Sequence, residues 1–321
     1  MIEPIMMEHG RKDRKNENRM KKTGVFFLLL ILLELPLSVL VSGLSDVFPK
    51  EYGTLVSLLA TQVYLLAGAV IFIRLSGISG RELGLTAFRL KSLIPMLLLF
   101  CLSGIVAMWL NLFSQLFVKN EVAGLVYNIT RVLPMWLGIL LIGCLPGIVE
   151  ELIYRGILYS VFRKRSVFTG VMVSALSFGL MHMNLNQIAY AIFMGMLFAL
   201  VVEATGSLLS SMLMHAVFNA INVVSLYRSS EMLKEAGQLI GEQTASKAEL
   251  LHFLGPLTPM AVIALYLSMK QFRMLAKMNG RDFSGEDAGT ETAEPVSLPL
   301  SLIAGWLVCL LIAVVNMVLE L

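Results

Sequence analysis

Long apolar runs separated by short polar stretches dominate the sequence. Nine runs lie at residues 25–44, 55–75, 92–118, 133–160, 167–182, 188–203, 207–227, 253–272 and 298–320. Most of them approach the roughly 20 residues that an α-helix needs to cross about 30 Å of hydrocarbon. None shows the alternation that is typical of a membrane β-strand. The pattern predicts an all-α protein, a polytopic transmembrane helix bundle of about eight to nine spans.

Composition supports a membrane protein. The chain has 321 residues, of which 57% are hydrophobic and only 15% are charged. Soluble domains carry about 25% charged residues, so much of this chain must be shielded from water. Cys101, Cys144 and Cys309 all lie inside apolar runs, where a cysteine behaves as a small hydrophobic residue. The sequence therefore indicates no disulfide framework.

Positive charge predicts the orientation of the helices. Residues 1–22 form a basic tail directly before the first span. Basic loops favour the cytoplasmic side of a membrane. With the N-terminus cytoplasmic, three clusters of Lys and Arg at 74–91, 163–165 and 270–281 also fall inside. We therefore expect an integral protein of the cell (plasma) membrane with the lipid bilayer as a partner and no nucleic acid, although a basic tail of this kind can also bind nucleic acid.

Changes in polarity divide the chain into six parts. They are a basic cytoplasmic tail at 1–22, N-terminal transmembrane helices at 23–129, a core at 130–227, a polar surface segment and transmembrane helix at 228–278, a flexible linker at 279–297 and a C-terminal transmembrane helix at 298–321. We expect a surface helix over 228–252. The linker is rich in Gly, Glu, Asp, Ser and Thr, which is typical of flexible chain.

One apolar run carries two adjacent glutamates. An ionisable side chain at the centre of a membrane helix costs roughly 3 kcal/mol, so it usually has a function. Glu151 and Arg155 are four residues apart, share a helix face and can form an ion pair. Glu150 points about 100° away and has no local cation. An apolar environment favours a neutral carboxyl, which suits a general base near neutral pH.

Small residues precede the glutamates. Gly143 and Gly147 are also four residues apart, so we expect another helix to approach closely at this level.

The structural alternative for the glutamates is a buried Glu–Arg pair that only fixes helix packing. Glu34 and Glu203, in other runs, are interpreted as helix-end or packing carboxylates.

Two further runs contain histidines. Phe178 and His182 share one helix face, and His215, Asn219 and Asn222 share another. Counting 1.5 Å per residue from the basic turn at 163–165 places Glu150 about 20 Å and His182 about 26 Å into the membrane. We therefore expect the three motifs at similar depth, with residues 183–187 sunk toward a water-filled cavity. There are two structural alternatives to a functional site. The histidines could be buried side chains whose ring nitrogens are hydrogen-bonded within the fold, or polar residues that only hold helices together.

The three motifs resemble those of the CPBP family, intramembrane proteases related to type II CAAX prenyl endopeptidases and to bacteriocin-processing or immunity proteins. The family pattern is Glu-Glu-x-x-x-Arg, Phe-x-x-x-His and His-x-x-x-Asn. The matching residues, in order, are Glu150, Glu151, Arg155, Phe178, His182, His215 and Asn219. The resemblance covers about residues 130–227.

The resemblance implies hydrolysis of a peptide bond in a peptide or protein substrate in or at the membrane. Glu150 would act as general base on water, and His182 would hold and polarise that water. His215 and Asn219 would bind a metal or stabilise the oxyanion. Glu151 and Arg155 would orient the first motif.

The sequence leaves several alternatives open. The metal alternative is Zn²⁺ held by Glu150, His182 and His215, because two histidines and a carboxylate suit a catalytic zinc. The other is a glutamate mechanism without metal. Rival functions are an ion- or proton-coupled transporter and a non-catalytic immunity or scaffold protein. The sequence does not predict the oligomeric state or whether the substrate is prenylated.

Overall fold

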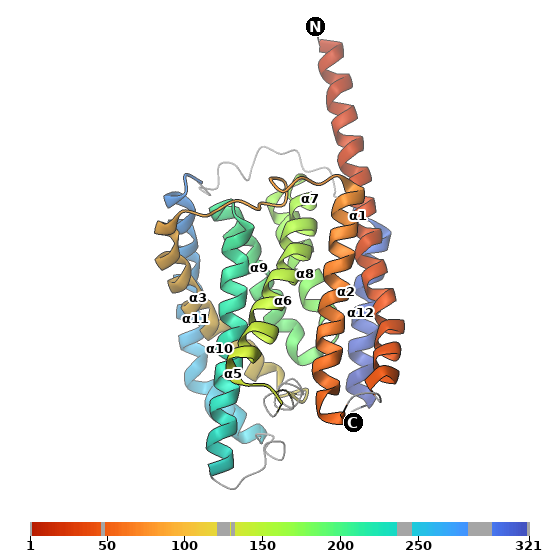
Figure 1. The fold of residues 1–321 in the computed structure, drawn as a ribbon. Helices are drawn as coiled ribbons and strands as arrows, with labels where there is room; N and C mark the ends of the chain where they lie inside the picture. Colours follow the sequence, from red (N-terminus) through yellow and green to blue (C-terminus); the bar gives the residue numbers. More distant parts are fainter. Residues whose placement is uncertain are drawn as a thin grey trace.

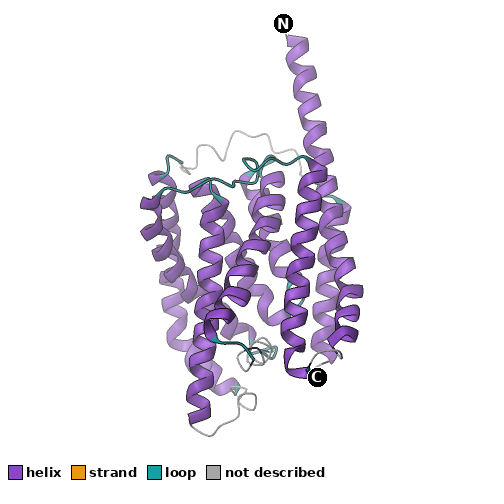
Figure 2. Ribbon diagram, in the orientation of Figure 1, coloured by secondary structure: helices purple, strands orange, loops and turns teal. Residues whose placement is uncertain are grey.

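A computed structural model describes residues 2–45, 49–120, 129, 132–235, 246–281 and 297–319. Eight helices in this part of the chain are long and apolar enough to cross a membrane, and a ninth apolar helix is shorter. Figure 2 shows helices joined by loops, with no strand among the described residues. The prediction of an all-α polytopic bundle with eight to nine spans is confirmed.

The long helices surround a central broken helix (Figure 1). They are α1 (Ile2–Ser45), α2 (Gly53–Ser76), α3 (Leu93–Ser114), α9 (Leu185–Thr205), α10 (Leu208–Glu235), α11 (Lys247–Met278) and α12 (Leu300–Leu319). The short helices η1 (Lys50–Tyr52) and η2 (Leu90–Ser92) precede α2 and α3. α1 packs against α2 and α12, while α3 packs against α9 and α11.

The central span, residues 135–162, alternates between α-helix and π-helix. It consists of α5 (Met135–Gly138), the π-helix η3 (Ile139–Cys144), α6 (Leu145–Glu151), the π-helix η4 (Leu152–Tyr159) and α7 (Ser160–Phe162). α8 (Val167–Met181) follows after four residues and therefore starts at the same end of the bundle. Its 15 residues cover only about 22 Å, so it ends before the full width of a membrane.

Local sequence signals explain where several helices begin and end. The Ser166 side chain accepts a hydrogen bond from the backbone N–H of Thr169 and caps the start of α8. Ser246 and Glu249 form a capping box at the start of α11. α9 ends at Gly206, whose φ of 71° lies in the left-handed region that favours glycine. These signals keep the turn between α9 and α10 short.

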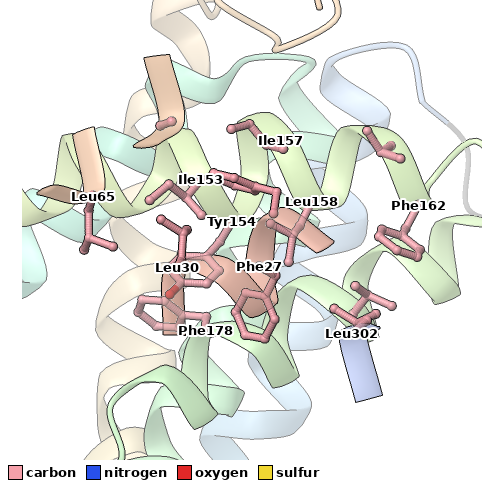
Figure 3. Close-up of a cluster of buried hydrophobic side chains, with 14 of the residues drawn as sticks. Phe27, Leu30, Leu65, Ile153, Tyr154, Ile157, Leu158, Phe162, Phe178 and Leu302 are labelled. Carbon is pink, nitrogen blue, oxygen red and sulfur yellow. The ribbon is translucent and has the colours of Figure 1, made fainter. Parts of the chain in front are cut away.

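The main apolar core joins the two ends of the chain to the central span. Phe27 and Leu30 of α1, Ile157 of η4, Phe178 of α8 and Leu302 of α12 all pack in this cluster (Figure 3). Large apolar side chains elsewhere are turned outward. Leu75, Ile94, Val262, Leu307 and Leu319 are examples, each at least 62% exposed. An apolar exterior of this kind fits an integral membrane protein.

One expectation about the polar segments changes, and another falls mostly outside the described residues. α10 continues through Glu235 and α11 starts at Lys247, so the described parts of 228–252 are extensions of spanning helices rather than a separate surface helix. Residues 236–245 lie outside the described residues. Most of the predicted linker, residues 282–296, also lies outside them.

Glu203 is a packing carboxylate, as its position at a helix end predicted. Its carboxylate accepts a hydrogen bond from Tyr159 Oη and forms ion pairs with Arg163 Nη2 at 2.7 Å and Arg281 Nη1 at 2.8 Å. Three segments of the chain are joined at this end of the bundle.

Candidate intramembrane active site

The two adjacent glutamates lie in α6, between the two π-helical stretches of the central span. π-helical turns are uncommon and are often found at functional sites. Pro146 stands in the first turn of α6, where a missing backbone N–H is tolerated. The irregular backbone alters the register on both sides of Glu150 and Glu151, so regular helical spacing alone does not define which neighbours they meet.

α10 approaches α6 closely through the predicted pair of glycines. A Cβ atom on Gly147 would lie 2.8 Å from the backbone nitrogen of Ala216, and one on Gly143 would lie 3.3 Å from Cα of Ala220. The first distance leaves no room for a side chain. The prediction of a close helix approach is confirmed, and it places His215 of α10 against the glutamates.

Glu151 and Arg155 form a fully buried ion pair. Arg155 Nη1 donates to Glu151 Oε1 at 2.6 Å, and Arg155 Nη2 donates to the carbonyl oxygen of Gly195 at 3.0 Å. Both side chains have 0% exposure. The guanidinium also lies 4.5 Å from the ring centre of Phe178 and 5.3 Å from that of Phe198. The predicted pairing is confirmed, and the pair fixes α6 against α8 and α9.

His215 lies between the two glutamates. Its Nδ1 is 3.0 Å from Glu151 Oε1, and its Nε2 is 3.8 Å from Glu150 Oε2. A carboxylate oxygen only accepts, so Nδ1 carries the proton in this contact. The ring also stacks on Phe198 at a centroid distance of 5.1 Å. These contacts fix the ring plane and leave Nε2 facing Glu150.

His182 is held in a comparable way. Its Nδ1 lies 2.8 Å from the carbonyl oxygen of Phe178, which can only accept, so Nδ1 donates and Nε2 remains the free ring nitrogen. The ring of Phe178 lies edge-to-face with His182 at 5.0 Å and with His215 at 5.5 Å. Phe178 therefore separates and orients the two histidines, which gives the aromatic residue of this motif a structural role.

Glu150 has the least complete set of partners in the cluster. Its side chain is 18% exposed. Among the described residues, Nε2 of His215 lies 3.8 Å from its Oε2 and Nε2 of Gln62 lies 3.5 Å from its Oε1. No Lys or Arg in the described part of the chain pairs with it. Arg155, which pairs with Glu151, lies near enough for an electrostatic interaction with Glu150 but forms no ion pair with it. A carboxylate with such weak contacts is free to accept a proton.

Gln62 of α2 is a site residue that the sequence reasoning missed. It is 6% exposed and contacts Glu150 from outside the three motifs. A single amide inside an otherwise apolar span was the available signal, because polar side chains in membrane helices usually face a partner. Glu34 of α1 also lies near enough to Glu150 for an electrostatic interaction. Phe198 gave no signal, since one aromatic among apolar residues is ordinary.

A cavity of about 590 Å³ lies against the histidines. His182, His215 and Asn219 line it, together with amide side chains that include Asn186 and Gln187. Its remaining wall is largely apolar. Glu150 is not among the lining residues and is reached through His215. His182 at the end of α8 and Asn186 and Gln187 near the start of α9 border this cavity, so two of the predicted residues 183–187 face it. That it is filled with water stays a prediction.

The metal expectation stays a prediction. Among the described residues, no three His, Cys, Asp or Glu side chains are grouped closely enough to hold one ion. His215 Nδ1 is already bound to Glu151, which leaves one nitrogen of each histidine available. We therefore derive the chemistry from the protein side chains alone.

Fold and site together define a class, an integral membrane protein with an intramembrane Glu–His site bordering a cavity. Residues 131–221 match the family model described as type II CAAX prenyl endopeptidase Rce1-like. This segment contains all seven motif residues, and the match confirms the resemblance to the CPBP family. No curated protein and no solved structure matches the chain. The relation to bacteriocin proteins stays a prediction.

Proposed function

We propose that the protein is an intramembrane endopeptidase that hydrolyses a peptide bond of a membrane-associated peptide or protein. The convergence of three distant motifs carries this proposal. His215 contacts Glu151 at 3.0 Å and lies 3.8 Å from Glu150, while Phe178 places His182 beside it. The family match over residues 131–221 supports proteolysis.

Glu150 is the general base in the proposed reaction. Its carboxylate takes a proton from a water molecule, and the resulting hydroxide attacks the carbonyl carbon of the substrate. The free Nε2 atom of His182 holds and orients this water. The protonated Glu150 then gives its proton to the leaving nitrogen as the C–N bond breaks. The products are an amine and a carboxylic acid, which then loses its proton to solvent, and Glu150 returns to its starting carboxylate state.

Asn219 stabilises the oxyanion that forms on the carbonyl oxygen by donating from its side-chain amide, and His215 can donate to it only in the imidazolium form, in which Nε2 is protonated as well as Nδ1. Donors fixed in a site that excludes bulk water are especially effective, because they need little reorganisation during the reaction. Asn219 lines the cavity one helical turn after His215, so its amide can donate into the same space. Glu151 and Arg155 do not contact substrate in this mechanism. They position His215 and α6.

Zinc dependence stays a prediction. If zinc is used, Glu150, His182 and His215 are its expected ligands, and purified active protein should contain about one zinc per chain and lose activity on chelation. Full turnover without a bound transition metal would support the glutamate mechanism. Elemental analysis alongside the activity assay separates the two.

Peptide cleavage by purified protein tests the proposed function. The protein is reconstituted in liposomes with a library of membrane-associated peptides, and products are identified by mass spectrometry. Cleavage at defined peptide bonds is expected. Ion or proton flux without cleavage would instead favour a transporter, and neither activity would favour an immunity or scaffold role.

We also propose that the N-terminus is cytoplasmic and that the protein lies in the plasma membrane. The basic residues of the 1–22 tail and of the 163–165 turn support this orientation. Cysteines introduced at Arg14 and Lys164 should be protected from an impermeant thiol reagent in intact cells. Labelling of both cysteines from outside would show that the topology is the reverse of the proposed one.

A further inference from the structure

A second cavity, of about 570 Å³, lies between the beginning of α1 and the end of α2. It is found at the end of the bundle where α1 extends beyond the other helices (Figure 1). Its α1 wall contains Arg14, Lys15, Asn18, Arg19 and Lys22. Their spacing of one, four, five and eight residues from Arg14 places them on one face of the helix. We call this cavity the basic pocket.

Most of the positive charge in the basic pocket is not neutralised. Arg19 Nη1 binds Glu82 Oε1 at 2.7 Å, and Lys164 Nζ binds the same oxygen at 2.9 Å. The other three cations of the α1 wall are exposed and make no ion pair with any residue that the structure describes. One carboxylate therefore serves two cations, and the pocket carries a net positive charge.

The spacing of these cations makes them repel one another. Lys15 and Arg19 are one helical turn apart, and Lys22 lies on the next turn of the same face. Like charges at this spacing destabilise a helix. An anion bound between them would convert that repulsion into attraction, while Asn18 and Ser76 add neutral hydrogen-bonding groups to the wall.

The opposite wall is apolar. Phe72, Ile78 and Val161 line it, and Phe72 stacks on Phe26 at a centroid distance of 4.3 Å. Further along α1 toward the apolar run, Val25 is 48% exposed. Cationic and apolar surfaces thus meet within a single pocket at the edge of the apolar spans. This combination suits an amphiphile rather than a small soluble anion.

We propose that the basic pocket binds the phosphate headgroup of an anionic phospholipid, with the acyl chains along the apolar surface of α1. Basic pockets between membrane helices and basic segments next to a span are typical sites for anionic lipids. Residues 14–22 and α2 lie outside the segment that matches the protease family. Of the lining residues, Val161 lies within that segment, but lipid binding is measured without peptide cleavage, so its test does not depend on the proposed hydrolysis.

Lipid titration tests this site on the full-length protein. Detergent-solubilised protein is titrated with phosphatidylglycerol, with phosphatidylcholine and with inorganic phosphate, and bound lipid is measured by native mass spectrometry. We expect preferential binding of phosphatidylglycerol. Each basic residue near a membrane surface adds roughly fivefold to the affinity, so replacing Arg14, Lys15 and Lys22 by Gln should weaken binding about a hundredfold.

A matched variant removes three cations from elsewhere at the same end of the bundle. Lys91, Arg273 and Lys277 are exposed and do not line the basic pocket, so replacing them by Gln should leave the tightest binding event unchanged. Equal losses in both variants would show a general surface-charge effect and overturn the proposal. Equal affinity for both lipids, or competition by inorganic phosphate at the lipid's own concentration, would overturn it as well.

Discussion

Glu150 and Glu203 are carboxylates of the same helix bundle, and they differ most in their partners. Glu203 is 6% exposed and is bound by two arginines and a tyrosine hydroxyl. Glu150 has one amide at 3.5 Å and one imidazole at 3.8 Å. A carboxylate whose oxygens are already satisfied stabilises the fold, whereas one with long contacts remains available for proton transfer. In the proposed mechanism, this difference in partners separates the structural carboxylate Glu203 from the catalytic carboxylate Glu150.

Glu151 lies in a fully buried ion pair, so we expect its replacement to have the largest effect on stability. Glu151→Gln leaves the fully buried Arg155 without its countercharge, and breaking a buried pair in this way costs about 3–5 kcal/mol. We expect a large fall in melting temperature and in folded yield, measured in detergent. The double variant Glu151→Gln with Arg155→Met should recover much of the loss. Unchanged stability in the single variant would contradict the assigned role.

Asn219 tests the chemical side of the comparison. Removing an oxyanion donor typically lowers kcat by about 10²–10³-fold, and Asn219→Ala should show this loss with little change in melting temperature. Asn222→Ala is the matched control, because Asn222 lines the same cavity nearly one helical turn further along α10. Its activity should fall much less. Equal activities in the two variants would remove Asn219 from the mechanism.

Glu203→Gln should weaken the fold without affecting the chemistry. Loss of a buried charged partner costs about 1–3 kcal/mol, since Arg163 and Arg281 keep their charges. Thermal melting should show this decrease, while activity per folded molecule should equal that of wild type. A selective loss of activity would mean that the Glu203 cluster also takes part in catalysis.

The smallest effect is expected at Glu82, which lies in the loop between α2 and η2. Hydrogen bonds from Lys164, the Ser79 backbone and Arg19 lower the pKa of Glu82 to about 2, against an ordinary value of 4.5. Its contribution is therefore complete above about pH 4.5 and is lost as the pH falls through about 2. Because the side chain is 32% exposed and solvent screens its ion pairs, we expect at most about 1 kcal/mol.

Melting temperatures of wild type and Glu82→Gln measured across this pH range check the prediction. The two curves should differ slightly near neutral pH and converge at about pH 2. Added salt should reduce the difference at neutral pH. A difference in melting temperature that grew as the pH fell would contradict the predicted direction of the pH dependence.

The sequence predicted the helices and the motif residues because both depend on local spacing. Apolar runs near 20 residues identified most spans, and the four-residue spacing of Glu151 and Arg155 predicted their ion pair. The Gly143 and Gly147 pair also predicted a close neighbour. These features follow from local spacing along one helix, and they hold even though Gly143 and Arg155 lie in its π-helical stretches.

Features that depend on the pairing of helices could not be predicted. Nothing in the sequence around Gln62 indicates that α2 lies beside α6, and nothing around Phe198 indicates that it stacks on His215. The π-helical stretches η3 and η4 contain ordinary apolar sequence. The extension of α10 to Glu235 replaced an expected surface helix, because polar residues can continue a spanning helix beyond the apolar layer. In each case the outcome depends on how the helices pack against one another, which the local sequence pattern does not specify.

Hydrolysis by Glu150→Gln, compared with wild type and with Glu203→Gln, tests the central claim most directly. All three proteins are purified, shown to be folded by thermal melting and assayed by mass spectrometry on one cleaved peptide. Glu150→Gln should retain its melting temperature and lose at least about 10²–10⁴-fold in rate, as expected for removal of a general base. Glu203→Gln should keep its rate per folded molecule. Wild-type turnover in folded Glu150→Gln would contradict the assignment of Glu150 as the catalytic base.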